Sequence, residues 1–93
     1  MRSGDVYKLE VVKNKYGVDH IYFIIIGWVD DECEISVVDN PYDDHILKLK
    51  MDCLEVTNTL TKKNIEDHLS KFTYIRHYDE TYELRLENRP IVR

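Results

Sequence analysis

Apolar and polar positions alternate along most of the first half of the chain, which is the pattern of half-buried β-strands. Alternating runs bounded by turn-forming residues predict four strands, at residues 5–12, 20–29, 33–39 and 45–56. The turns between them, at 13–19, 30–32 and 40–44, are short, so neighbouring strands should pair in antiparallel fashion. Residues 5–56 are therefore predicted to form a four-strand antiparallel β-meander.

The register of the strands supports this interpretation, because pairing across each turn should gather apolar side chains on one face. Closing the turns produces such pairs across all four strands: Leu9 with Phe23, Tyr7 with Ile25, Ile25 with Val37, Val37 with Leu47, and Ile35 with Leu49. Cys33 and Cys53 lie on the same face. We therefore expect Ile25, Ile35 and Leu49 to be buried neighbours.

The second predicted strand is apolar on both faces, so its second face needs a cover. A helix at 61–72 is predicted to supply it, because this segment has an apolar stripe at helical spacing and a suitable N-cap. The stripe consists of Ile65, Leu69 and Phe72, and the N-cap is Thr61. All three apolar side chains of the stripe should therefore be buried.

Two further alternating runs, at 73–78 and 82–87, predict a C-terminal β-hairpin that is followed by a tail at 88–93. The apolar parity of the fourth strand changes near residues 52–54, which indicates a bulge of the kind that lets small sheets curl. The expected fold is one β-rich α+β domain, residues 1–93, with a strongly curled antiparallel sheet, one α-helix and the hairpin. Partial closure into an SH3-like barrel is one option for such a sheet.

The residues Gly4-Asp5-Val6-Tyr7, which enter the first strand, resemble the opening of plasmid-maintenance endoribonuclease toxins, whose fold is an SH3-like barrel. Those toxins carry an Arg-Pro pair near their second strand. The only Arg-Pro pair in this chain is Arg89-Pro90, so no catalytic residue is assigned from the resemblance.

The charge of the chain restricts its partners. With 13 basic and 18 acidic residues the net charge is −5, which disfavours nonspecific binding to nucleic acid. The longest apolar run, residues 21–29, falls short of the roughly 20 residues of a membrane-spanning helix, and no secretion signal is visible. We therefore expect a cytoplasmic protein with no membrane partner and free thiols.

Enzymatic chemistry finds little support in the sequence. Both cysteines lie on the predicted core face, where apolar surroundings raise a thiol pKa and make it a poor nucleophile. Isolated glycines at 4, 17 and 27 form no phosphate-binding loop, so no cofactor is predicted. The sequence therefore predicts no catalytic residue.

A metal site is the sharpest chemical hypothesis. His20 opens the second predicted strand, and Asp43 and His45 flank the start of the fourth, at the same end of the predicted sheet. Imidazole and carboxylate groups suit zinc or a similar divalent ion. Asp-Asp-His after Asn-Pro is also ordinary turn composition, and we favour that structural interpretation.

Two groups of side chains are candidate binding residues. Tyr74, Tyr78 and Tyr82 lie in the predicted C-terminal hairpin, and tyrosine contributes large contact area at low entropic cost. The second group, Asp30, Asp31 and Glu32, occupies an exposed turn, where charges set orientation and association rate more than affinity.

These observations favour a non-enzymatic protein–protein interaction module that docks on another protein. The chain has no Ala and many Ile, Lys, Asn and Asp residues, as AT-rich coding sequences do, so an inhibitor or accessory protein of a phage or other mobile element is one such module. A small-barrel nucleic-acid-binding protein is the first alternative, and a metal-dependent hydrolase is the second. Oligomeric state is left open by the sequence.

Overall fold

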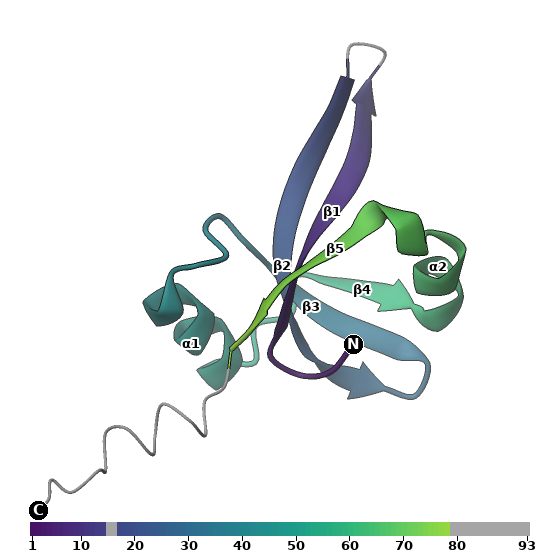
Figure 1. Cartoon of the computed structure of the whole chain (residues 1–93). Coiled ribbons are helices and arrows are strands. Elements are labelled where there is room, and N and C mark those ends of the chain that lie inside the picture. The colour runs from purple at the N-terminus through teal and green to yellow at the C-terminus, as the bar shows by residue number, and fades with distance from the viewer. Residues whose placement is uncertain (15–16, 79–93) are drawn as a thin grey trace, which may run out of the picture.

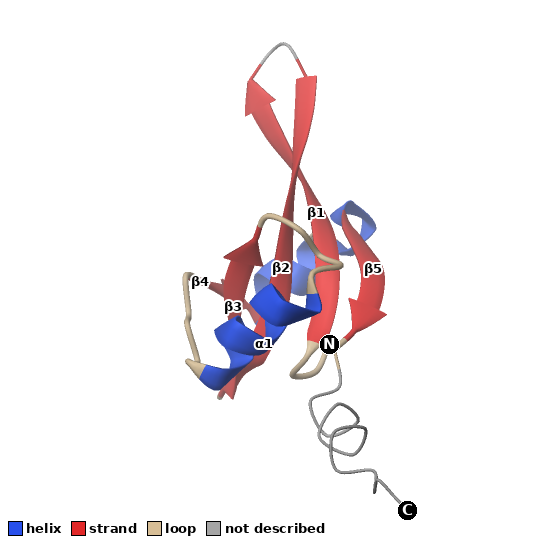
Figure 2. Ribbon diagram, turned by 90° about the vertical axis from the view of Figure 1, so that its left-hand side faces the viewer, coloured by secondary structure: helices blue, strands red, loops and turns tan. Residues whose placement is uncertain are grey.

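The computed structural model, which describes residues 1–14 and 17–78, contains a five-stranded antiparallel sheet with a helix against each face (Figure 1, Figure 2). The strand order is β4-β3-β2-β1-β5, and the strands are β1 (Asp5–Asn14), β2 (Gly17–Val29), β3 (Glu32–Val38), β4 (Asn58–Thr61) and β5 (Phe72–His77). The helices are α1 (Asp44–Asp52) and α2 (Lys62–Asp67), and a 3-10 turn, η1 (Leu69–Lys71), follows α2. Strands β4 and β5 are the two edges, so the sheet is open and partial closure into a barrel is wrong. The strong curl stays a prediction.

The first three predicted strands are confirmed, with a corrected register. Tyr7 pairs with Phe23 rather than with Ile25, because the pairing of β1 with β2 extends to Asn14 and Gly17, into the segment 13–19 that the sequence analysis assigned to a turn. A bulge between Ile25 and Gly27 then shifts β2 against β3, so that Ile25 pairs with Ile35. The register of β1 against β2 differs from the predicted one by two residues, so each side chain stays on its predicted face of the sheet.

The fourth predicted strand is wrong, because most of 45–56 forms helix α1. Asp43 caps this helix, and its Oδ1 accepts hydrogen bonds from the backbone N–H groups of His45 (3.1 Å) and Ile46 (3.3 Å). Leu, Lys and Met are strong helix formers, whereas the same residues in alternation imitate a strand. Leu49 is consequently 49% exposed instead of buried.

Strand β4 takes the place beside β3 that the sequence analysis assigned to 45–56. Cys33 pairs with Leu60 in this strand, and Ile35 pairs with Asn58. Cys53, at the C-terminal end of α1, is exposed, so its predicted place on the core face is also wrong.

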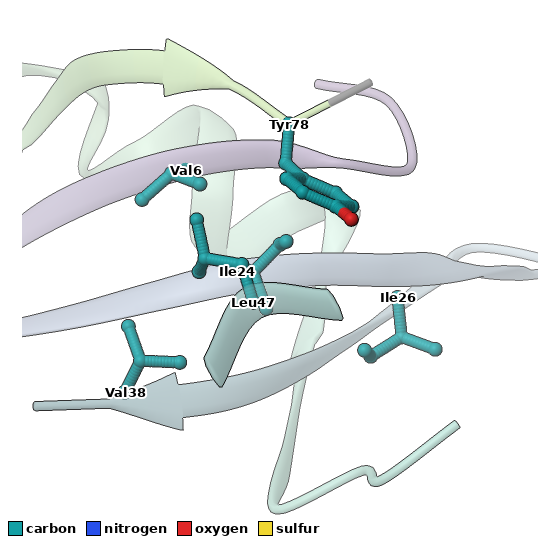
Figure 3. Packing of buried hydrophobic residues seen from close by; sticks show 6 residues of the cluster. All are labelled: Val6, Ile24, Ile26, Val38, Leu47 and Tyr78. Atoms are coloured by element: carbon teal, nitrogen blue, oxygen red, sulfur yellow. The ribbon is translucent and has the colours of Figure 1, made fainter. Parts of the chain in front are cut away.

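Both faces of the sheet are covered, as the two-sided apolar pattern of β2 requires. Figure 3 shows the cluster on the α1 side, where six buried residues pack together: Val6, Ile24, Ile26, Val38, Leu47 and Tyr78. The cluster on the α2 side consists of Phe23, Ile25, Cys33, Ile35 and Ile65. The second face of β2 is therefore covered by α1, and the C-terminal helical segment covers the other face, contrary to expectation.

The helical segment begins where the sequence predicted. Thr61 is the N-cap of α2, and its Oγ1 accepts a hydrogen bond from Asn64 N at 3.1 Å. The α-helix ends at Asp67, and the tighter 3-10 turn that follows moves Leu69 off the stripe of Ile65. Leu69 is therefore 59% exposed, which corrects its predicted burial.

Strand β5 confirms the first strand of the predicted C-terminal hairpin. It pairs with β1, a long-range partner that the sequence analysis did not predict, with Tyr7 opposite Tyr74. The second strand of that hairpin, 82–87, and the tail, 88–93, lie outside the described residues.

The C-terminal end of α1 forms a Schellman motif around a leucine. Leu54 N donates to Met51 O and Glu55 N donates to Lys50 O, while Leu54 has the left-handed φ of 48°. Glycine normally occupies this position because a Cβ is unfavourable there.

Leu54→Gly is expected to raise the free energy of unfolding by about 1 kcal/mol, since it relieves the left-handed strain at an exposed side chain. Urea denaturation of the two proteins measures the difference. A variant that is less stable than the wild type would show that the Leu54 side chain contributes contacts that outweigh the strain.

Candidate functional site

Beyond the sheet proper, β1 and β2 continue as a two-stranded arm (Figure 1, Figure 2). The pairing of β1 with β5 stops at Leu9, and the pairing of β2 with β3 starts at Tyr22. Residues 10–14 and 17–21 of the two strands therefore pair only with each other among the described residues, and we call them the arm.

An apolar groove of about 370 Å³ lies at the base of the arm, on the α2 side. We call it the arm groove, and eight residues from β1, β4, α2, η1 and β5 line it: Leu9, Glu10, Val11, Leu60, Asn64, His68, Lys71 and Phe72. Elements distant in the sequence therefore supply four apolar residues, which we call the floor, and four polar or charged ones. The exposed surface of the lining is mostly apolar, and a mostly apolar lining with some polar groups is the usual character of a binding site.

Phe72, which lines the arm groove, belongs to a cluster of four aromatic rings with Tyr7, Phe23 and Tyr74. Tyr7 stacks on Phe23 at 5.9 Å between ring centroids and makes edge contacts with Phe72 at 6.4 Å and Tyr74 at 5.6 Å. Tyr74 is 53% exposed at the sheet edge, although its ring contacts Tyr7. An exposed aromatic held by its neighbours loses little side-chain entropy when a partner covers it.

A second groove, of about 300 Å³, lies on the opposite side of the sheet beside α1. We call it the α1 groove, and its lining mixes apolar and acidic side chains: Val37, Val38, Asp39, Asn40, Asp43, Ile46, Leu49 and Lys50. A separate hollow of about 190 Å³ lies beside it along β2, and its lining shares Val37, Val38 and Asp39 with the α1 groove. Asp39 therefore borders both depressions.

The candidate metal ligands come from two elements, since His20 belongs to β2 whereas Asp43 and His45 lie at the N-terminal end of α1. His20 is exposed on the arm, Asp43 caps α1, and His45 is exposed in the first turn of that helix. Within residues 1–14 and 17–78, no group of three or more His, Cys, Asp or Glu side chains is arranged to hold a metal ion.

The acidic turn joins β2 to β3 at the end of the sheet where α2 begins. Its side chains are exposed, Asp30 has a left-handed φ of 54°, and Asp31 O accepts a hydrogen bond from Lys62 N at 2.8 Å. The turn therefore lies at the opposite end of β3 from Asp43, and neither groove includes Asp30, Asp31 or Glu32 in its lining.

The three candidate tyrosines differ in position. Tyr74 is exposed beside the arm groove, Tyr78 is buried in the core on the α1 side, and Tyr82 lies outside the described residues. Sequence analysis missed the floor of the arm groove, which includes Leu9, Leu60 and Phe72. The sequence carries little indication of this groove, because its floor residues come from strands whose pairing is long-range.

The buried Cys33 thiol and the Asp5–His77 pair are structural in character. Burial raises the pKa of the Cys33 thiol to about 11, which keeps it protonated at neutral pH. His77 Nδ1 lies 2.8 Å from Asp5 Oδ1, and Asp5 Oδ2 also accepts from Arg2 N at 3.0 Å. The pair therefore ties the N-terminal turn to the end of β5.

Comparison of the chain with protein-family models, with curated proteins and with solved structures found no match. Among the helices in the described part of the chain, none is long and apolar enough to cross a membrane.

Proposed function

We propose that this protein is a non-enzymatic interaction module that docks on another protein through the arm groove. The observation that carries this proposal is the combination of an apolar groove with the exposed aromatic ring of Tyr74 on the same side of the sheet. Apolar and aromatic side chains that are already held in place are the usual centres of binding energy in protein interfaces.

The shape of the site supports a protein partner. A two-stranded arm exposes the outer edges of both its strands, and isolated two-stranded ribbons are only marginally stable in water. A partner in the arm groove contacts the base of the arm through Leu9 and Val11 and the helical wall through His68 and Lys71. Binding of this kind therefore buries apolar surface and braces the arm.

A nucleic-acid-binding function is the second candidate, because Lys62, Lys63 and Lys71 lie on the α2 side, where Tyr74 exposes a ring for stacking. Lys63 is engaged by Asp67 at 3.2 Å, and Glu10 lines the groove, so the positive charge available to a phosphate backbone is small. These acidic groups favour the protein partner.

The test compares partner capture by immobilised wild-type protein with capture by a Val11→Lys, Tyr74→Ser variant. Lysine at position 11 places a charge on the floor of the arm groove. The same lysine lies opposite Asp19 in the arm, and this pair of opposite charges is compatible with the pairing of β1 and β2. We expect about tenfold or greater loss of the captured protein at physiological salt, because two apolar contacts are removed.

Neutralising the acidic turn, with Asp30→Asn, Asp31→Asn and Glu32→Gln together, is the matched control. We expect it to change capture at low salt and to have little effect at physiological salt. If the acidic-turn variant loses more than about 3 kcal/mol of binding free energy at physiological salt, the turn is the main contact and the arm-groove proposal is wrong. Capture of nucleic acid that is lost steeply with salt would instead favour the second candidate.

A further inference from the structure

We propose that the α1 groove binds a basic, apolar segment of a partner protein, independently of the arm groove on the other side of the sheet. Four of its eight lining residues are apolar: Val37, Val38, Ile46 and Leu49. The neighbouring hollow along β2 shares Val37, Val38 and Asp39 with the groove, so an extended segment can contact both depressions, whereas a single side chain cannot.

The negative charge of the segment around the α1 groove favours a partner segment with basic side chains. Residues 39–56 carry five acidic and two basic side chains, a net charge of −3. Both lysines are engaged, since Lys50 Nζ lies 2.7 Å from Glu55 Oε2 and Lys48 Nζ lies 3.2 Å from Asp52 Oδ2.

Two carboxylates that line the groove take no part in these ion pairs. Asp44 is paired with Arg76 at 2.7 Å, whereas Asp39 and Asp43 have no basic partner within the described residues. Asp43 caps the helix through Oδ1, and Asp39 borders both depressions. A partner cation near Asp39 therefore completes the charge balance of the groove, while neighbouring apolar side chains cover Val37 and Leu49.

One exposed apolar side chain belongs to the groove itself. Leu49 lines it and is 49% exposed, so its surface is available to a partner. A metal ion or another small cation would leave the Leu49 side chain exposed to water. An apolar peptide segment can bury it, which is favourable.

The experiment titrates the full ¹⁵N-labelled chain with three synthetic peptides of equal length and follows its amide resonances. In the first peptide leucine alternates with arginine, in the second with glutamate, and in the third serine replaces leucine and alternates with arginine. We expect saturable binding of the leucine–arginine peptide with shifts centred on Val37, Asp39 and Leu49, and binding at least about tenfold weaker for each of the others.

Two single variants test the contacts. Asp39→Asn, which keeps the side-chain shape, is expected to weaken the leucine–arginine peptide about threefold to fivefold at low salt and less at high salt. Leu49→Ser is expected to weaken it about fivefold at both, because it removes apolar contact. Both positions are exposed, so the amide spectrum should show an intact fold.

Asp30→Asn is the matched control, because it removes one exposed carboxylate from the distant turn. Equal weakening by Asp30→Asn and Asp39→Asn would mean general attraction to an acidic protein and would overturn the proposal. Equal binding of the serine–arginine peptide, or shifts centred on the arm groove, would overturn it as well. None of these outcomes alters the arm-groove test, which uses different residues and a different partner.

Discussion

Gly4→Ala is expected to destabilise the protein by about 3 kcal/mol or more, because position 4 has no room for a side chain. The backbone φ of Gly4 is 93°, which L-residues rarely adopt. A Cβ added there would lie 2.5 Å from Tyr78 O and 2.9 Å from Cε1 of His77. The contact with Tyr78 O can be relieved only if the backbone moves, because that oxygen is a backbone atom.

The effect should be large because Gly4 joins three segments. Its N–H donates to Ile25 O at 2.8 Å, and its carbonyl accepts from Tyr78 N at 2.8 Å. The adjacent Asp5–His77 contact and the buried ring of Tyr78 depend on the same geometry. Displacing Gly4 therefore disturbs the start of β1, the middle of β2 and the end of β5 together.

Gly27→Ala is the control for this prediction, since among the described residues outside its chain neighbours an added Cβ would meet only Ser3 Oγ within 4 Å, at an ordinary contact distance of 3.7 Å. Urea denaturation of both variants gives the comparison. We expect the Gly27 variant to lose less than about 1 kcal/mol. Similar losses for the two variants would show that position 4 has no special constraint.

The strands that neighbour each other in the sequence could be predicted, and the long-range pairings could not. Strands β1, β2 and β3 follow from alternation and from turn residues, because each pairs with its neighbour along the chain. The pairing of β5 with β1 joins segments about 70 residues apart, and no local pattern encodes it. For the same reason the arm groove, which depends on this pairing, could not be derived from the sequence.

The segment 45–56 shows how a local pattern can satisfy two structures. Its leucines and lysines alternate, which is typical of a strand, but Leu47 and Met51 also lie four residues apart on one helical face. The N-cap at Asp43 and the high helix propensity of the segment favour the helix. Because the Asn-Pro-Tyr-Asp-Asp stretch was interpreted only as a turn, its capping role was missed.

The exposure of the candidate tyrosines could not be derived from the sequence, because exposure depends on the tertiary fold. Tyr74 and Tyr78 have the same side chain and lie four residues apart, yet Tyr74 is exposed and Tyr78 is buried. A register irregularity between β1 and β5, near Val6 and Tyr7, changes which face the later residues of β5 present. Such a bulge cannot be located from one strand alone.

The helix and strand interpretations of 45–56 make different predictions for two leucines. In the helix, Leu47 is fully buried against the sheet and Leu49 is exposed. Leu47→Ala is therefore expected to cost about 2 to 5 kcal/mol, because it removes a buried side chain and leaves a cavity in the α1-side core. Leu49→Ala should change stability by less than about 0.5 kcal/mol.

Guanidinium or urea denaturation of the two alanine variants measures this contrast directly. A strand at 45–56 would place both leucines on one face and would make the two losses comparable, since residues 47 and 49 have the same parity. The helix also requires that Leu47→Ala weaken the packing of Val6, Ile24 and Val38, which line the same cluster. Amide exchange in β2 and β3 should therefore accelerate in the Leu47 variant and stay unchanged in the Leu49 variant, and the opposite result would disprove the assignment of α1.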